Sequence, residues 1–407
     1  MRKACARQGA RASLLMMARA MAIATATVGP GAATLATAAE IAVPLTYLRQ
    51  EVEAPPVLSN LDPIPEDLGV AGAEVALADT KTTGRFLGHA YSLEVVSVEP
   101  GGDLAGAAKA ALAASPALFV DAPADDILAI ADLPEAAGKL IFNVASGDRK
   151  LRDGDCRANV LHTIPEDAMR ADALMQVLKA RRWTRTALIV GPKPQDAAFA
   201  ATLRASAAKF GVTIAAEKAW TFDTDLRRAA GQEIPLFTQG FPDHDILLVA
   251  DEADDFARYV EHNTWLPRPV AGSDGLRGEG WAPVLEQWAA VQLQNRFEKA
   301  AKREMRSRDY AAWTALRTVG EAVTRTNSAD PATLRGFILS DAFALDGFKG
   351  RTLTYRRWNG QLRQPMAVVN ARALVELAPL EGYLHQINEM DTLGLDKPES
   401  ACKAFGG

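Results

Sequence analysis

Short apolar runs alternate with helix-like stretches from residue 41 onward, and this rhythm limits the fold more than any other feature. The runs are brief, rich in Val, Ile, Leu and Phe, and bounded by turn residues, which is typical of strands buried on both faces. The stretches between them are rich in Ala and have helical periodicity. This alternation predicts βαβ units around a parallel sheet. We expect strands at 41–48, 91–98, 117–121 and 140–144, and helices at 67–80, 103–115 and 124–133.

The same pattern begins again near residue 156. A strand is expected at 156–162, and Thr163 and Glu166 have the spacing of a capping box, in which two side chains satisfy free amides at a helix start. Two successive half-sheets of similar layout predict an α/β fold of two Rossmann-like lobes, with parallel central sheets joined by a multi-strand hinge. In the second half we also expect strands at 187–190, 212–216 and 245–250 and a helix at 194–210.

Beyond residue 272 the pattern changes to longer helices and a terminal hairpin. Asn359-Gly360, between apolar segments at 351–355 and 365–370, is a strong hairpin signal. Helices are expected at 282–302, 310–326 and 331–340. We assign residues 40–155 and about 273–342 to lobe 1, residues 156–272 and about 343–395 to lobe 2, and residues 396–407 to a C-terminal tail.

The first 39 residues differ from the rest in charge. They contain five Arg or Lys residues and no acid, an apolar run at 14–28 broken only by Arg19, and small residues at 35–39. This arrangement predicts a signal peptide at 1–39, with an amphipathic or membrane-lying helix as the alternative. Removing these five cations from a chain of net charge −5 leaves 40 basic against 50 acidic residues, which is −10. We therefore expect an acidic periplasmic protein that does not bind nucleic acid.

The cysteines fit that compartment. Cys5 would leave with the signal peptide, so that Cys156 and Cys402 remain, an even number in an oxidising space. We predict a disulfide between them that ties the C-terminus to the middle of the chain. Two unpaired buried thiols are the alternative, because sequence does not reveal the distance between two side chains.

The motifs of catalytic sites are missing. The strand at 41–48 is followed by Arg49 rather than a glycine-rich turn, and no P-loop, H-E-x-x-H or G-x-S-x-G motif occurs. The five histidines are scattered, and His244 is better explained by a solvated turn than by a metal site. The acidic residues at 251–255 lack the spacing of a calcium loop and favour a helix start. We therefore expect neither an enzyme nor a catalytic cofactor or metal.

Polar and aromatic residues gather at the carboxyl ends of the predicted strands, where open α/β sheets bind their ligands. A solvated loop or a structural role is the alternative for each of them. Trp183, Trp288 and Trp313 lie at helical positions that favour core packing, whereas Trp220 and Trp281 are placed to reach a cleft. The candidate ligand-binding residues are Tyr47, Arg49, Asn143, Ser146, Arg149, Arg152, His162, Lys193, Trp220, Asp274 and Trp281.

Two segments carry a resemblance to a known family. The segments CRANVLHTIP at 156–165 and FKGRTLTY at 348–355 resemble the type I periplasmic binding proteins of ABC importers, the class of the branched-chain amino acid receptors. The resemblance covers the chain after the signal peptide and implies a receptor that closes over its ligand and serves a membrane permease. Three further segments are similar to the branch associated with pyrroloquinoline quinone-dependent alcohol dehydrogenases: EQWAAVQLQNRF at 286–297, NGQLRQP at 359–365 and EGYLHQINEMDTLG at 381–394.

This second resemblance implies pyrroloquinoline quinone, a flat aromatic tricarboxylate, as the bound ligand. Receptors of the amino acid class have a Ser/Thr-rich loop where this chain has the basic residues Arg149, Lys150 and Arg152. Guanidinium groups suit carboxylates, and an indole ring suits a flat aromatic molecule. Arg49, Arg149, Arg152 and Lys193 are expected to supply the cations, and Trp220 or Trp281 the stacking face.

Two other functions remain open from the sequence. One is a receptor for an amino acid or another small organic acid. The other is an accessory factor of a periplasmic quinoprotein dehydrogenase that does not take part in transport.

Overall fold

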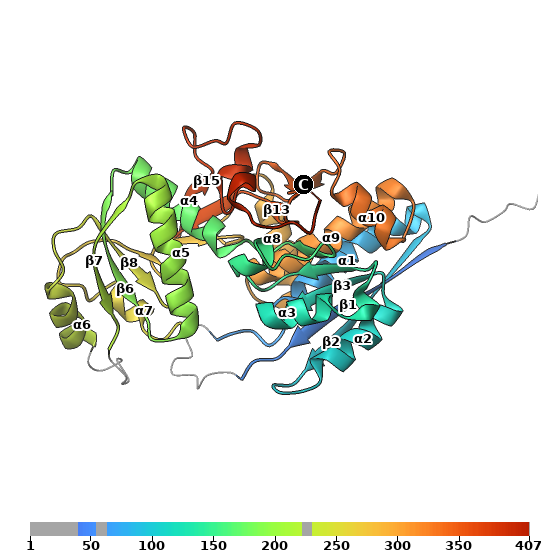
Figure 1. The fold of residues 1–407 in the computed structure, drawn as a ribbon, viewed down its shortest axis with the longest axis horizontal. Coiled ribbons are helices and arrows are strands. Elements are labelled where there is room, and N and C mark those ends of the chain that lie inside the picture. The colour runs from blue at the N-terminus through green and yellow to red at the C-terminus, as the bar shows by residue number, and fades with distance from the viewer. Residues whose placement is uncertain (1–39, 54–62, 222–229, 407) are drawn as a thin grey trace, which may run out of the picture. The chain divides into compact units, whose positions relative to one another are not determined.

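Two parallel sheets form the centres of two lobes, as the repeated pattern predicted (Figure 1). The structure, a computed structural model, describes residues 40–53, 63–221 and 230–406, so the predicted signal peptide lies outside the described residues. The first sheet has the order β2-β1-β3-β4-β5 and the second the order β7-β6-β8-β9. Their strands are β1 Ile41–Gln50, β2 His89–Val98, β3 Ala117–Asp121, β4 Leu140–Asn143, β5 Val160–His162, β6 Arg185–Val190, β7 Thr213–Ala219, β8 Ile246–Ala250 and β9 Val270–Gly272.

The first sheet is covered by helices on both faces, and its central strands β3 and β4 are buried at every position. Along β3, Phe119 packs in one core while Leu118 and Val120 pack in another, as the alternation of side chains across a strand requires. The first core contains residues of α1, α8, α9 and α10, and the second contains residues of α2 and α3. These helices are α1 Val70–Leu87, α2 Leu104–Ala114, α3 Ala124–Ala131, α8 Ala290–Ala301, α9 Ser307–Thr326 and α10 Pro331–Ile338.

The second sheet is built in the same way. Leu248 of β8 packs in a core with residues of α4 and α5, whereas Leu247 and Val249 pack with residues of α6 and α7. Helix α5 ends where predicted, because Gly211 adopts a left-handed φ of 65° that a glycine tolerates without strain. The helices of this lobe are α4 Asp167–Ala180, α5 Pro194–Phe210, α6 Ala230–Gln239 and α7 Ala257–Val260.

A small antiparallel sheet joins the two cores. In β14 (Met366–Val369), Ala367 and Val369 belong to the core of lobe 1, whereas Met366 and Val368 belong to the core of lobe 2. Successive side chains of one strand therefore anchor both lobes. The strand pairs with β10 (Arg277–Glu279) and with β15 (Leu374–Ala378).

The predicted hairpin around Gly360 has a different second arm. Strand β12 (Thr352–Tyr355) pairs with the short strand β13 (Leu362–Arg363) and with β11 (Leu345–Asp346), whereas residues 366–369 belong to the interlobe sheet. Gly360 makes the turn with a φ of 71°. The prediction failed for 365–370 because the apolar alternation that favours a hairpin arm also suits a strand buried between two cores.

Two predicted helix starts are also corrected. Helix α8 begins at Ala290 rather than 282, because Trp288 and Ala289 have left-handed φ angles of 53° and 63°. The capping box is absent at α4, since Thr163 donates to the Asn143 carbonyl and Glu166 accepts from the Leu395 amide. Tertiary partners thus took both side chains that local spacing had assigned to a helix end.

The described helices include none that is long and apolar enough to cross a membrane.

Candidate functional site

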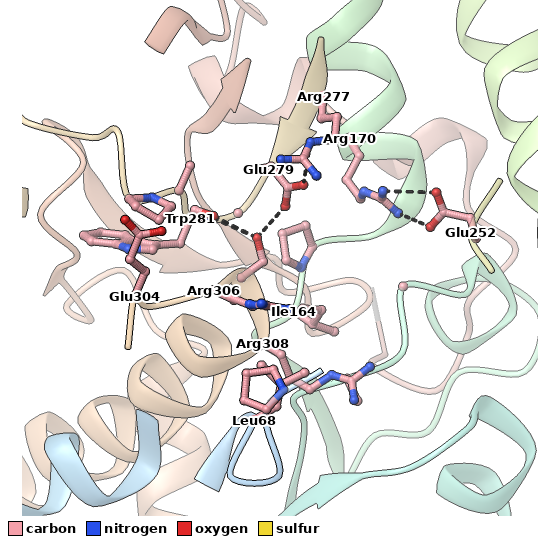
Figure 2. A pocket seen from close by; sticks show the side chains of 18 of the residues that line it. Leu68, Ile164, Arg170, Glu252, Arg277, Glu279, Trp281, Glu304, Arg306 and Arg308 are labelled. Carbon is pink, nitrogen blue, oxygen red and sulfur yellow. Dashed lines mark hydrogen bonds and ion pairs between the residues drawn. The ribbon is translucent and has the colours of Figure 1, made fainter. Parts of the chain in front are cut away.

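A cavity of about 860 Å³ lies at the carboxyl ends of strands from both sheets (Figure 2). Loops that follow β4, β5 and β8 line it, together with β10 and the start of α9. This is the edge of an open α/β sheet at which ligand sites are expected. The volume falls within the range of about 300–1,000 Å³ that is common for small-molecule pockets. Its lining is charged and includes the arginines Arg170, Arg277, Arg303, Arg306 and Arg308 and the acids Asp167, Glu252, Glu279 and Glu304.

Arg170 and Glu252 form a bidentate pair across the cavity wall (Figure 2). The Arg170 nitrogens lie 2.8 and 3.3 Å from the two Glu252 oxygens, and Arg170 also donates to Asp167 at 3.1 Å. Burial raises the pKa of Glu252, but the charge and hydrogen bonds of Arg170 and the Ser273 hydroxyl outweigh it and leave this pKa below its ordinary value. Burial raises the pKa of Asp167, against the effect of Arg170. Arg170 is therefore committed to carboxylates of the protein itself.

Arg303 is committed in the same way. It donates to both carboxylate oxygens of the buried Asp309, at 2.7 and 2.8 Å, and to Asp67 at 2.8 Å. Asp309 also accepts from the Gly69 amide at 2.7 Å, so that it caps the start of helix α1. The pairing holds the start of α9 against the start of α1 beside the cavity.

Arg277 and Arg308 also line the cavity, but their ion pairs are longer than those of Arg170 and Arg303. The Arg277 Nε atom lies 3.9 Å from the nearest Glu279 oxygen, and Arg308 Nη1 lies 3.4 Å from Asp121 Oδ1. Neither guanidinium donates a hydrogen bond to any residue that the structure describes. Their side chains are 38% and 41% exposed.

Trp281 is the one predicted residue found in the cavity lining of the described chain. The residue is only 2% exposed, and its ring stacks on Tyr310 at 4.8 Å between ring centroids and donates from Nε1 to Gln294. The Ser307 hydroxyl lies 3.1 Å from the Trp281 amide and donates to Glu279 at 2.7 Å (Figure 2). The Trp281 indole therefore packs in the core and also lines the cavity.

Asn143, Ser146 and His162 lie just behind the wall rather than in it. Asn143 donates to the Ser146 carbonyl at 2.8 Å and accepts from the amides of Ala145 and Ser146, which shapes the loop that carries the lining residues Ala145 and Gly147. Its amide nitrogen also lies 3.1 Å from His162 Nδ1. Burial holds the pKa of His162 well below its ordinary value, and the nearby positive charge of Arg152 adds to this.

Arg152, predicted to bind the ligand, is completely buried instead. It donates to the carbonyls of Ser146, Asp148 and Ile164 and to the Gln361 side chain, at 2.8–3.1 Å. Burial lowers its pKa to about 10. Because residues 145, 147 and 164 line the cavity, Arg152 fastens two loops of the wall from behind.

The other predicted residues also lie outside the cavity lining. Arg149 is 52% exposed and paired with Asp153. The Tyr47 hydroxyl donates to Asp121 at 2.9 Å, and Trp220 packs against Phe256 in the core of lobe 2. Three positions remain: Arg49 donates to the Glu66 carbonyl, the Lys193 amide at the start of helix α5 donates to Asp196, and Asp274 accepts from the Gly275 amide.

The sequence interpretation missed the arginines that do line the cavity. Arg303, Arg306 and Arg308 form a second basic cluster, less dense than the one at 149–152, and this cluster was a usable signal. Glu252 is the second residue after β8, but its acidic neighbours suggested a helix start. Arg170 and Arg277 offered no signal, since one begins a helix and the other lies in a three-residue strand.

The predicted disulfide between Cys156 and Cys402 is present, which excludes the alternative of two free thiols in this structure. Beside it, the Ser400 hydroxyl donates to the Arg152 carbonyl and the Ala401 amide donates to Asp153. The C-terminal segment is therefore fastened to the residues that hold the cavity wall. Within the ranges that the structure describes, no cluster of His, Cys, Asp and Glu is suited to a metal ion.

Comparison with known proteins supports the fold, and a segment of the chain matches a protein family. Residues 64–230 match the family described as periplasmic binding protein. No curated protein sequence matches. A branched-chain amino acid ABC transporter periplasmic ligand-binding protein from Burkholderia xenovorans LB400 is 16% identical, with a TM-score of 0.68 over 89% of this chain and 100% of that one.

Two structures with bound ligands have the same fold. An ABC transporter substrate-binding protein from Desulfitobacterium hafniense, in complex with Leu, is 18% identical, with a TM-score of 0.63 over 83% of this chain and 99% of that one. A solute-binding protein from R. palustris, in complex with benzoate, is 12% identical, with a TM-score of 0.61 over 89% and 99%. The chain therefore has the fold of the periplasmic binding proteins, and its segment 64–230 matches that family in sequence as well.

Proposed function

We propose that this protein is a periplasmic receptor that captures a small organic acid in the cavity between its two sheets. The observation that carries the proposal is the arginine-rich lining at the carboxyl ends of strands from both lobes. A guanidinium group is the protein cation best suited to a carboxylate, because it offers two parallel donors. Leucine and benzoate, which occupy two proteins of this fold, also carry a carboxylate.

The specific ligand we propose is pyrroloquinoline quinone. The support for this choice is the resemblance of residues 286–297, 359–365 and 381–394, together with a cavity whose volume and arginines suit a flat tricarboxylate. The arginines of the cavity, rather than Arg149 and Arg152, would then hold the carboxylates. A receptor for an amino acid or another small acid is the alternative that the leucine complex favours.

Export and delivery complete the proposal. Residues 1–39 would direct secretion, and the loaded receptor would serve an ABC permease or hand its ligand to a quinoprotein dehydrogenase. N-terminal sequencing of the protein from a periplasmic fraction tests the first step. A chain that still begins at Met1 would contradict it.

Calorimetric titration of the exported protein with pyrroloquinoline quinone, leucine and benzoate tests the ligand. We expect saturation by pyrroloquinoline quinone at micromolar concentration, with quenching of tryptophan fluorescence. In a Trp281→Phe variant most of the quenching is lost, whereas Trp220→Phe, with its ring in the core of lobe 2, retains it. Saturation by leucine alone would contradict pyrroloquinoline quinone as the ligand but would still support the receptor function. Binding of no acid, with a stable protein partner instead, would favour the accessory-factor function.

A further inference from the structure

The arginines of the cavity divide into those that the protein uses itself and those that it does not. Arg170 and Arg303 each donate to two carboxylates of the chain. Arg306 donates to the Pro63 carbonyl. Arg277 and Arg308 make only long ion pairs and donate no hydrogen bond within the described residues. These last two guanidiniums are thus equipped to bind a ligand without breaking a bond of the fold.

Arg277 and Arg308 come from different elements and reach the cavity from separate edges (Figure 2). Arg277 is on β10, which pairs with the interlobe strand β14, and Arg308 is in the first turn of α9. One carboxylate held by either residue would leave the other without an acceptor. The nearest acids of the described chain do not fill this role, because Glu279 Oε1 lies 3.9 Å from Arg277 and Asp121 Oδ1 lies 3.4 Å from Arg308 without a hydrogen bond in either pair.

We infer that the ligand carries two separated anionic groups, one bound by Arg277 and the other by Arg308. This inference rests on the proposed receptor function and narrows its ligand to dicarboxylates and larger polycarboxylates. Each carboxylate would receive two charge-assisted hydrogen bonds from a guanidinium that is more than half shielded from water. A zwitterion fits less well, since an ammonium group needs an acid that no cation of the protein already neutralises. Asp167 and Glu252 are paired with Arg170, Glu279 lies beside Arg277, and Glu304 is exposed.

Three probes, benzoate and two of its para-substituted derivatives, test the inference by calorimetry on the full exported protein. Terephthalate has two opposed carboxylates, benzoate has one, and 4-(aminomethyl)benzoate pairs a carboxylate with an ammonium group. We expect terephthalate to bind at least about tenfold more tightly than either of the others.

Single substitutions then assign the two ends. Arg277→Gln and Arg308→Gln should each weaken terephthalate binding about tenfold or more, whereas benzoate binding should weaken in only one of the two variants. Arg325→Gln is the matched control, because Arg325 pairs with Glu321 on helix α9 and does not line the cavity. Thermal unfolding of each variant, measured by circular dichroism, confirms that the fold is retained.

The outcomes separate this inference from the receptor proposal. Equal affinity for the three probes, or tightest binding of 4-(aminomethyl)benzoate, would overturn the two-anion ligand and leave the receptor intact. If pyrroloquinoline quinone binds and the small probes do not, the two variants are tested on it, and unchanged affinity in both overturns the inference. Binding of no acid at all contradicts the receptor proposal itself.

Discussion

Arg152 lies behind the cavity wall, whereas Arg277 and Arg308 face the cavity. The three residues have the same side chain in opposite surroundings. Arg152 has no exposed surface and four hydrogen bonds, three of them to backbone carbonyls. Arg277 and Arg308 are more than a third exposed and donate no hydrogen bond within the described chain. The difference shows that positive charge in the sequence does not reveal its use. A guanidinium whose N–H groups donate to the protein stabilises the fold, whereas one with unused N–H donors is available to a ligand.

Loss of Arg152 should be the most damaging change to stability. In Arg152→Met the Asp148 carbonyl and the Gln361 side-chain oxygen lose their partner inside the protein, and the carbonyls of Ser146 and Ile164 each lose one of two donors. We therefore expect the free energy of unfolding to fall by about 3–5 kcal/mol. Chemical denaturation at pH 7 measures it. Arg149→Met, at an exposed position whose side chain pairs with Asp153, serves as the control and should cost less than about 0.5 kcal/mol. Similar costs for both variants would erase the distinction between the two classes of arginine.

Removal of the disulfide should have the next largest effect. In the Cys156→Ser, Cys402→Ser double variant we expect a loss of about 2–4 kcal/mol, because the bond closes a long loop in the unfolded chain. The Ser400 and Ala401 contacts with residues 152–153 should weaken as well. Hydrogen exchange should therefore quicken at 145–148, while strand β8 is unaffected. An increase confined to 396–406 would show that the C-terminal segment does not support the wall.

The Arg170–Glu252 pair should give a smaller effect that depends on pH. The pKa of Glu252 in the folded chain lies below its unfolded value, so the unfolded chain binds more protons between the two pKa values. The stability that this pair adds is thus complete above about pH 5 and is lost as the pH falls through the folded pKa. Comparison of Glu252→Gln with the native chain isolates this contribution from Asp167, whose raised pKa acts in the opposite direction.

We expect Glu252→Gln to lower the free energy of unfolding by about 1–2 kcal/mol at pH 7 and by much less at pH 3. Urea denaturation at a series of pH values provides the measurement. Glu304→Gln, at an exposed position of the same lining, should stay close to the native stability at each pH. A Glu252→Gln deficit that grows as the pH falls would reverse the sign of the argument.

The fold was predictable because hydrophobic periodicity is a local property of the chain. The runs at 117–121 and 140–144 correspond to β3 and β4, which are buried along their whole length. Gly211 ended a helix as expected, since its conformational freedom does not depend on distant residues. The prediction failed where one pattern suited two structures, as at 365–370, which lies between two cores rather than in a hairpin.

The candidate site was predictable only in its position. Its place at the carboxyl ends of the strands follows from the parallel βαβ order, which the sequence reveals. The choice of residues did not follow, because Arg152 and Arg308 both lie in arginine-rich segments. Only the three-dimensional packing places carbonyl oxygens around Arg152 and leaves Arg308 facing the cavity.

By itself the sequence determined the two-lobed α/β architecture and the edge of the sheets where a ligand would lie, and it left two cysteines that could form a disulfide. The tertiary structure decided which charged groups form hydrogen bonds within the fold and which remain available to a ligand at that edge. The physical reason is that the burial of apolar residues follows the local periodicity of the sequence, whereas the hydrogen bonds of a buried polar group depend on partners far away along the chain.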